Sequence, residues 1–187
     1  MNFTENDLPD ERIIEDVLAG KDGAFIQLVN RYRRKVFAMT ARFARDKDDL
    51  DDICQDIFIK VYENLGKFRG DAPFEHWLSR IAIRTCYDAL RKRRREKGHI
   101  PLDDIHYQIA DESGEELLVA EEARSLLGKG LAELKPAERL VITLLELEEK
   151  PVREIAELTG WSEVNVKVRA FRARQKLKRI LEKHHER

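Results

Sequence analysis

Basic side chains crowd a C-terminal segment whose apolar residues recur at helical spacing. One stripe of this predicted helix is apolar and consists of Val166, Ala170, Ala173, Leu177 and Ile180. The cations on its other faces are Lys167, Arg169, Arg172, Arg174, Lys176, Lys178 and Arg179. Guanidinium and ammonium groups bind phosphate oxygens, and the major groove of DNA admits an α-helix. The segment therefore predicts a helix that binds nucleic acid.

A shorter helical pattern precedes this helix, and a Gly-Trp-Ser turn joins the two. The inward residues of the first helix are Ile155, Ala156 and Leu158. Gly160 stands where a helix ends in the left-handed conformation, and Ser162 is a good N-cap for the helix that follows. These signals predict a helix-turn-helix whose second helix enters the groove. A solvated amphipathic helix is the alternative, but it needs neither the turn nor the cap.

Charge is segregated along the chain although the total nearly cancels. There are 35 Lys and Arg residues against 36 Asp and Glu residues, which leaves a formal net charge of −1. A basic run, RKRRREK, occupies 91–97, whereas 98–123 contains no Lys or Arg and a second acidic cluster lies at 46–56. Acidic blocks repel phosphate, so a polycation that coats any nucleic acid is excluded. The charge pattern predicts several partners with different preferences.

Helical periodicity recurs almost throughout the chain, which predicts an all-α protein with two small helical domains. We expect an N-terminal domain over 1–97, a flexible acidic linker over 98–117 and a C-terminal helix-turn-helix domain over 118–187. No stretch approaches the apolar length of a membrane span, and the acidic N-terminus does not resemble a signal peptide. A cytoplasmic protein without direct membrane insertion is therefore expected.

Residue types that bind metals or attack substrates are scattered. Cys54 and Cys86 lie in helical patterns without a C-x-x-C or Cys/His pairing, so two reduced, buried thiols are expected. No nucleophile is matched with a base, and the histidines are dispersed as His76, His99, His106, His184 and His185. A glycine-rich phosphate loop is also lacking. The sequence predicts no metal, no cofactor and no disulfide, and it favours a binding protein over an enzyme.

Three helices are predicted in the first third of the chain. The first covers 12–19, and the second covers 24–45 with Asp22 as its candidate N-cap. The third begins at the acidic cluster, where Asp48 and Asp49 favour the positive end of the helix dipole. A polar edge continues along this helix through Asp52, Gln55 and Asp56. This edge predicts a docking surface for a basic or polar partner.

A fourth helix follows a loop that contains aromatic residues and glycine. Its core-facing residues are Phe74, Trp77, Leu78, Ile81, Ala82, Thr85 and Ala89. A separate stripe, at steps of four, three and four residues, contains Arg80, Arg84, Tyr87 and Arg91. Cations that alternate with an aromatic ring suit backbone phosphates and an unstacked base, as single-stranded nucleic acid requires. The alternative is a solvated surface with a half-buried tyrosine.

Three runs, in order, carry a family resemblance: DDLDDICQDIFIKVYENLGKFRG, FEHWLSRIAIRTCYDALRKRRR and VKVRAFRARQKL. Together they resemble bacterial sigma-70-type initiation factors of the small, extracytoplasmic-function (ECF) group, across nearly the whole chain. The resemblance implies an alternative sigma factor that binds RNA polymerase and is not an enzyme. Its N-terminal domain would open the promoter near the −10 element, and its C-terminal domain would read the −35 element.

The resemblance also implies roles for particular residues. Contact with the beta and beta′ subunits of core RNA polymerase would involve Asp51, Asp52, Gln55 and Asp56. Strand opening and base capture at −10 would involve Phe68, Arg80, Arg84, Tyr87 and Arg91. At −35, the groove contacts would be Lys167, Val168, Phe171 and Arg172, and the residues closer to phosphates would be Arg169 and Arg174. The implied partners are core polymerase, duplex and single-stranded promoter DNA, and an anti-sigma factor.

Two residues of the recognition helix depart from the family pattern. Asn165 stands where these proteins often have Thr, and Val168 stands where a small hydroxyl residue is common. The preferred duplex sequence therefore cannot be copied from relatives, although a valine favours a thymine methyl.

Two alternatives stay open. The acidic linker predicts either a polyanion that threads a basic channel of the polymerase or a solvated tether. The second function that the sequence allows is a stand-alone helix-turn-helix regulator with an N-terminal sensing or dimerisation domain. Such a regulator has no need of the polar docking edge or of the stripe of cations around a tyrosine.

Overall fold

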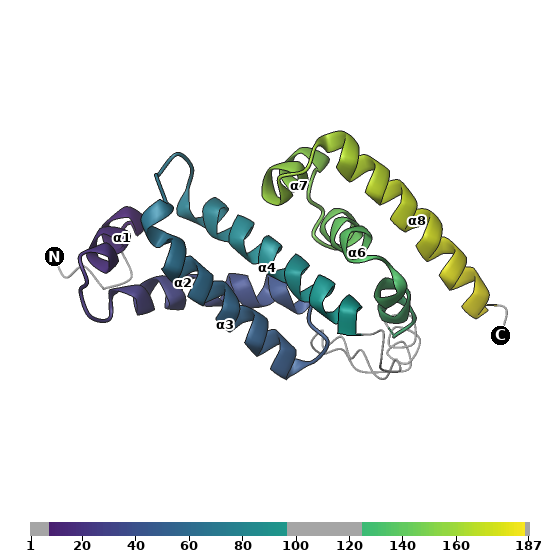
Figure 1. Cartoon of the computed structure of the whole chain (residues 1–187), viewed down its shortest axis with the longest axis horizontal. Helices are drawn as coiled ribbons and strands as arrows, with labels where there is room; N and C mark the ends of the chain where they lie inside the picture. The colour runs from purple at the N-terminus through teal and green to yellow at the C-terminus, as the bar shows by residue number, and fades with distance from the viewer. Residues whose placement is uncertain (1–7, 97–124, 186–187) are drawn as a thin grey trace, which may run out of the picture.

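The computed structural model describes residues 8–96 and 125–185, with 184–185 described in backbone only. Within these ranges the chain is helical and has no strand, which confirms the predicted all-α fold (Figure 1). The N-terminal domain contains α1 (Asp10–Leu18), α2 (Ala24–Ala41), α3 (Lys47–Asn64), the 3-10 helix η1 (Leu65–Lys67) and α4 (Phe74–Glu96). The C-terminal domain contains helical residues 125–133, α6 (Pro136–Ile142), the π-helical turn η2 (Thr143–Leu147), α7 (Val152–Thr159) and α8 (Glu163–His185).

The predicted acidic linker, 98–117, lies outside the described residues, and the predicted limits of the three segments stay predictions. Across 8–96 and 125–185, no helix is both long and apolar enough to span a membrane.

Two predicted features of α2 are wrong. Its N-cap is Gly23 rather than Asp22, and Gly23 has a φ of 74°, a left-handed conformation that glycine adopts without steric penalty. The helix also ends at Ala41, earlier than predicted. Phe43 leaves the helical path and becomes fully buried, with its N–H donated to the carbonyl of Thr40 at 2.8 Å. Burial of Phe43, rather than apolar periodicity, therefore sets the end of α2.

Helices α3 and α4 pack against each other and carry two of the predicted surfaces. Helix α3 begins in the acidic cluster as predicted, and the side chain of Asp46 caps it by accepting from the N–H of Asp49 at 2.8 Å. On α4 the predicted core face is confirmed: Trp77, Ile81 and Ala89 are half-buried, and the fully buried members are Phe74, Leu78, Ala82 and Thr85. This packing fixes the outward faces of both helices.

The two domains share one apolar core. Leu90 of α4 belongs to the same buried cluster as Leu140, Leu144 and Ile155 of the C-terminal domain. Helix α4 contacts both α6 and α7, and these elements lie side by side in Figure 1. A smaller cluster inside the C-terminal domain consists of Leu131, Leu134, Ile142 and Ala173. The helix-turn-helix is therefore placed directly beside α4.

Candidate nucleic-acid interface

The turn between α7 and α8 has the geometry predicted from its sequence. Gly160 ends α7 with a φ of 77°, where any residue with a Cβ is strained. Oγ of Ser162 accepts from the N–H of Asn165 at 3.2 Å and so caps the first turn of α8. Ile155 and Leu158 are buried beneath the turn. The predicted helix-turn-helix is confirmed.

Helix α8 buries one apolar stripe and exposes most of its other residues. Val166, Ala170, Ala173 and Ile180 are buried, and Leu177 is half-buried. The predicted groove contacts are all exposed: Lys167, Val168, Phe171 and Arg172. Phe171 keeps 64% of its surface accessible, so its ring adds little to the core and is available to a partner.

An exposed apolar line on α8 adds a residue that the sequence interpretation missed. Val164 is 71% exposed and precedes the exposed Val168 and Phe171 by one and two helical turns. This spacing places the three side chains on one face. The spacing is visible in the sequence, but Val164 lies outside the apolar stripe that predicts the core. Apolar side chains in this position suit contact with thymine methyl groups.

Two arginines predicted to lie near phosphates have partners within the protein. The guanidinium of Arg169 lies 4.4 Å from the ring centroid of Trp161, and its Nε donates to the side-chain oxygen of Asn165. Arg174 donates from Nε and Nη2 to Oε1 of Glu146, at 2.9 and 2.5 Å. Arg169 is thereby held at the start of α8, whereas Arg174 is drawn toward η2. A phosphate would have to share Arg174 with Glu146.

The predicted stripe of arginines around Tyr87 is present on α4, and Tyr87 contacts the helix-turn-helix. Arg80, Arg84 and Arg91 are exposed, whereas Tyr87 is half-buried. The rings of Tyr87 and Trp161 meet edge to face, with centroids 5.5 Å apart and an interplanar angle of 85°. The guanidinium of Arg91 lies 5.7 Å from the Tyr87 centroid. Tyr87 is therefore partly covered within the stripe that should receive a base.

Phe68, the last residue predicted for strand opening, lies in an aromatic cluster. Its ring centroid is 5.5 Å from that of Phe74 and 5.6 Å from that of Trp77. The cluster holds the loop before α4 against the start of the helix, so Trp77 has the structural role that its spacing predicts. The structure does not bring Phe68 to Tyr87, which lies further along α4.

The predicted polymerase contacts share one exposed edge of α3, formed by Asp51, Asp52, Gln55 and Asp56. The same helix continues with two exposed apolar residues, Ile59 and Tyr62. The ring of Tyr62 packs against Phe25 of α2 with centroids 5.0 Å apart. Ile59 and Tyr62 follow Asp52 at helical steps of three and four residues, so the sequence already indicates that they share its face. A surface with an acidic end and an apolar end suits a protein partner.

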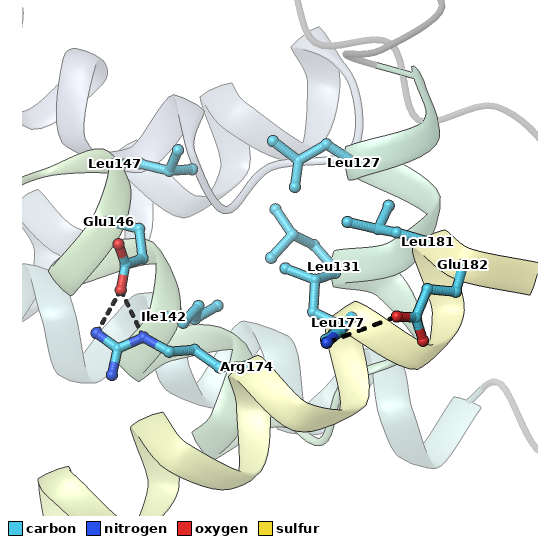
Figure 2. A pocket seen from close by; sticks show the side chains of 10 residues that line it. Leu127, Leu131, Ile142, Glu146, Leu147, Arg174, Leu177, Leu181 and Glu182 are labelled. Atoms are coloured by element: carbon cyan, nitrogen blue, oxygen red, sulfur yellow. Dashed lines mark hydrogen bonds and ion pairs between the residues drawn. The ribbon is translucent and has the colours of Figure 1, made fainter. Parts of the chain in front are cut away.

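An apolar pocket of about 440 Å³ opens in the C-terminal domain, between α8 and helical residues 125–133 (Figure 2). Its apolar walls are Leu127, Leu131, Ile142, Leu147, Leu177 and Leu181. The rim carries the ion pairs Arg174–Glu146 and Lys178–Glu182. Gly130 permits the close packing beside the pocket, because a Cβ there would lie 2.7 Å from Cδ1 of Leu177. The sequence did not predict this pocket, since its walls come from separate elements.

Both cysteines are buried, as predicted, and their thiols are free in the structure. Burial raises the pKa of Cys54 to about 11 and that of Cys86 to about 12. Both groups are therefore neutral at physiological pH, and a thiolate nucleophile is disfavoured.

Comparison of the sequence with known proteins identifies the family of the chain. Two family models match the chain, Sigma-70 region 2 over residues 28–96 and Sigma-70, region 4 over residues 124–177. The RNA polymerase sigma-H factor of Pseudomonas aeruginosa is 32% identical over 181 residues, which cover 92% of this chain and 94% of that protein. The chain belongs to the sigma-70 family. The ECF RNA polymerase sigma-E factor of Escherichia coli K12 is 34% identical over 176 residues, covering 90% of this sigma factor and 92% of the relative.

Two solved structures share the fold. CnrH, solved in complex with the cytosolic domain of CnrY, is 27% identical, with a TM-score of 0.58 over 92% of this chain and 97% of CnrH. RpoE of Bartonella quintana, co-crystallised with the anti-sigma factor NepR, is similar in fold, with 22% identity and a TM-score of 0.60 over 84% of this chain and 96% of RpoE. The sigma-H and sigma-E relatives and the two family models confirm the predicted ECF-type alternative sigma factor. The region 2 match contains α3 and α4, and the region 4 match contains the helix-turn-helix.

Proposed function

We propose that this sigma factor directs core RNA polymerase to promoters through two DNA contacts, with α8 in the duplex at −35 and α4 on the opened strand at −10. The observation that carries the proposal is the exposed face of α8 beside its buried stripe. On that face Lys167 is a groove contact, Arg172 is suited to a base edge, and the apolar line from Val164 to Phe171 faces thymine methyls.

The −10 contact is assigned to the stripe on α4. Arg80 and Arg84 precede Tyr87 and Arg91 follows it, so cations flank a ring on which a base can stack. Stacking on an aromatic side chain contributes about 1–3 kcal/mol per base. This is comparable to the few kcal/mol needed to take a base out of a duplex. Binding to α4 can therefore support strand opening without any chemical step.

Core polymerase is proposed to dock at two places. The first is the edge of α3, where the acidic residues up to Asp56 are followed by Ile59 and Tyr62. The second is the pocket beside α8, whose leucine walls and charged rim fit an amphipathic helix of a polymerase subunit (Figure 2). With one docking surface in each domain, the sigma factor would contact both the beta and the beta′ subunits.

An anti-sigma factor is a further proposed partner. RpoE of Bartonella quintana, which is similar in fold, was co-crystallised with the anti-sigma factor NepR. The docking surfaces on α3 and in the C-terminal pocket are exposed and partly apolar, which suits a competitor for polymerase.

Run-off transcription tests the proposed function. Purified bacterial core polymerase is supplied with a library of randomised upstream DNA, with and without this protein. Specific transcript starts that depend on the protein support the proposal and reveal both promoter elements. An absence of transcripts, together with sequence-specific duplex binding by the protein alone, would instead favour the stand-alone regulator.

A further inference from the structure

The guanidinium of Arg169 is held from two sides by groups that carry no charge. Its Nε donates to the side-chain oxygen of Asn165, one helical turn earlier on α8. Its Cζ lies over the ring of Trp161, in the turn before α8, at 4.4 Å from the ring centroid. Neither interaction uses the two terminal nitrogens, Nη1 and Nη2. Both nitrogens therefore remain able to donate to one phosphate, in the paired geometry that a planar guanidinium allows.

Both neighbours of this guanidinium are themselves fixed by the helix-turn-helix. The backbone N–H of Asn165 donates to Oγ of Ser162 at 3.2 Å, which caps the first turn of α8. The backbone N–H of Trp161 donates to Oγ1 of Thr159 at 3.3 Å, and this hydroxyl donates to the carbonyl of Ile155 at 2.7 Å. The backbone contacts that form the turn therefore also place the two groups that hold the guanidinium.

Two other cations of α8 are held by carboxylates instead. Nζ of Lys167 lies 3.9 Å from Oε2 of Glu163, and Nη2 of Arg174 lies 2.5 Å from Oε1 of Glu146. A phosphate has to share each of these cations with an anion of the protein, which weakens the attraction. Arg169 is half-buried between an amide and an indole. It therefore combines a fixed position with a positive charge that no carboxylate offsets at these two contacts.

We propose that Asn165 and Trp161 are positioning residues for −35 binding, and that they hold Arg169 ready for one phosphate before the duplex binds. The inference rests on the proposed −35 role of α8. Ordering a long side chain during binding costs conformational entropy, and a side chain that is already ordered avoids this cost. Asn165 is also one of the two positions at which the recognition helix departs from the family pattern, so its role cannot be copied from relatives.

Substitution of Asn165 tests the proposal and leaves the helix cap in place, because the cap uses the backbone N–H of this residue. Asn165→Ala should weaken binding of holoenzyme to the −35 duplex selected by run-off transcription and to a scrambled duplex alike, by about two- to tenfold. The slope of log affinity against log salt should stay unchanged, because the arginine still reaches the phosphate. Asn30→Ala is the matched control, since it removes an exposed amide from α2 and should change neither affinity.

Double variants separate positioning from direct contact with DNA. In an Arg169→Ala background, Asn165→Ala should have no further effect, since no guanidinium is left to position. Arg169→Lys keeps the charge but not the planar group, so it should keep the salt slope and also be insensitive to Asn165→Ala. Trp161→Phe and Trp161→Leu should weaken duplex binding progressively, because indole attracts a cation most strongly. This progression should vanish in the Arg169→Ala background.

The outcomes separate this inference from the proposed function. Unchanged affinity in Asn165→Ala, together with a loss in Arg169→Ala, would overturn the positioning role while the phosphate contact stands. An equal loss for Asn165→Ala with and without Arg169 would assign Asn165 to the DNA itself and would overturn the positioning role as well. If Arg169→Ala changes neither the affinity nor the salt slope, the phosphate contact of the proposed function fails, and the positioning role fails with it.

Discussion

The buried Arg93 forms an ion pair with the half-buried Asp49, with Nη2 of Arg93 3.3 Å from Oδ2 of Asp49. Nη1 of the same guanidinium donates to the carbonyl of Phe43 at 2.7 Å. The Asp49 carboxylate also accepts from the N–H of Arg45 at 2.8 Å. One arginine of the basic run therefore closes the connection between α2 and α3 and is not part of a phosphate-binding patch.

We expect Arg93→Ala to lower the free energy of unfolding by about 3 kcal/mol, because Asp49 and the Phe43 carbonyl would each lose a buried partner. Arg94→Ala is the matched control, since Arg94 is an exposed neighbour on α4. That substitution should change stability by no more than about 0.5 kcal/mol. Urea unfolding of both variants checks the prediction, and equal losses would contradict the structural role of Arg93.

Local signals in the sequence were sufficient for the helix-turn-helix. Gly160 and Ser162 act through the backbone next to them, and the buried stripe of α8 follows from its own period. The resemblance to the sigma-70 family added roles for residues that spacing alone leaves undefined. Fold class and the exposure of the α8 groove residues were therefore predictable.

Contacts between segments far apart in the sequence could not be predicted from local signals. Arg93 looks like its exposed neighbours in the sequence, and only tertiary packing assigns it to Asp49. Trp161 is a turn residue whose partner, Tyr87, lies in the other domain. The end of α2 was misplaced for the same reason, since burial of Phe43 overrides the helical pattern. Propensity and periodicity carry no information about such partners.

The two buried thiols should lower the free energy of unfolding at alkaline pH. The pKa of Cys54 and that of Cys86 are raised by burial from 9.0 to about 11 and about 12, so the folded state favours the protonated thiols. This contribution is fully present below pH 9 and is lost as the pH rises from 9 toward 12. Each thiol contributes a slope of at most about 1.4 kcal/mol per pH unit in that range. Urea unfolding at pH 8, 9 and 10 should show a shallower decline for Cys86→Ala than for the unsubstituted chain, and parallel declines would contradict the assignment.

Charge on the α3 edge should control polymerase binding. Asp52→Lys places a cation among the exposed acidic residues and should weaken the affinity for core polymerase by at least about tenfold, since the proposed docking edge would then repel a basic partner. Asp22→Lys makes the same change of charge in the exposed connection before α2 and should have little effect. Fluorescence anisotropy with labelled sigma factor measures both affinities. Equal weakening by the two variants would indicate a general effect of net charge.

Substitution of Phe171 should distinguish a role in DNA binding from a role in folding. The ring is 64% exposed, so Phe171→Ala should change the free energy of unfolding by no more than about 0.5 kcal/mol. Binding to the selected −35 duplex should nevertheless weaken by about tenfold, because an anchor in the groove is removed. Ile155→Ala is the structural comparison; Ile155 is fully buried, and its truncation should cost about 2–5 kcal/mol of stability. A loss of stability in Phe171→Ala would reassign its ring to the fold.

The two arginines near the start of α8 should differ in what their loss does to specificity. Arg172 is exposed on the groove face, so Arg172→Ala should reduce binding to the selected −35 duplex by about 1–3 kcal/mol and reduce discrimination against a scrambled duplex. Arg169 is stacked on Trp161 and is assigned to a phosphate, so Arg169→Ala should weaken both duplexes alike and lower the slope of log affinity against log salt by about one. Titration of holoenzyme against both duplexes at several salt concentrations distinguishes these effects. Equal losses on both duplexes for Arg172→Ala would remove its base-reading role and leave Val164, Val168 and Phe171 as the candidates for reading sequence.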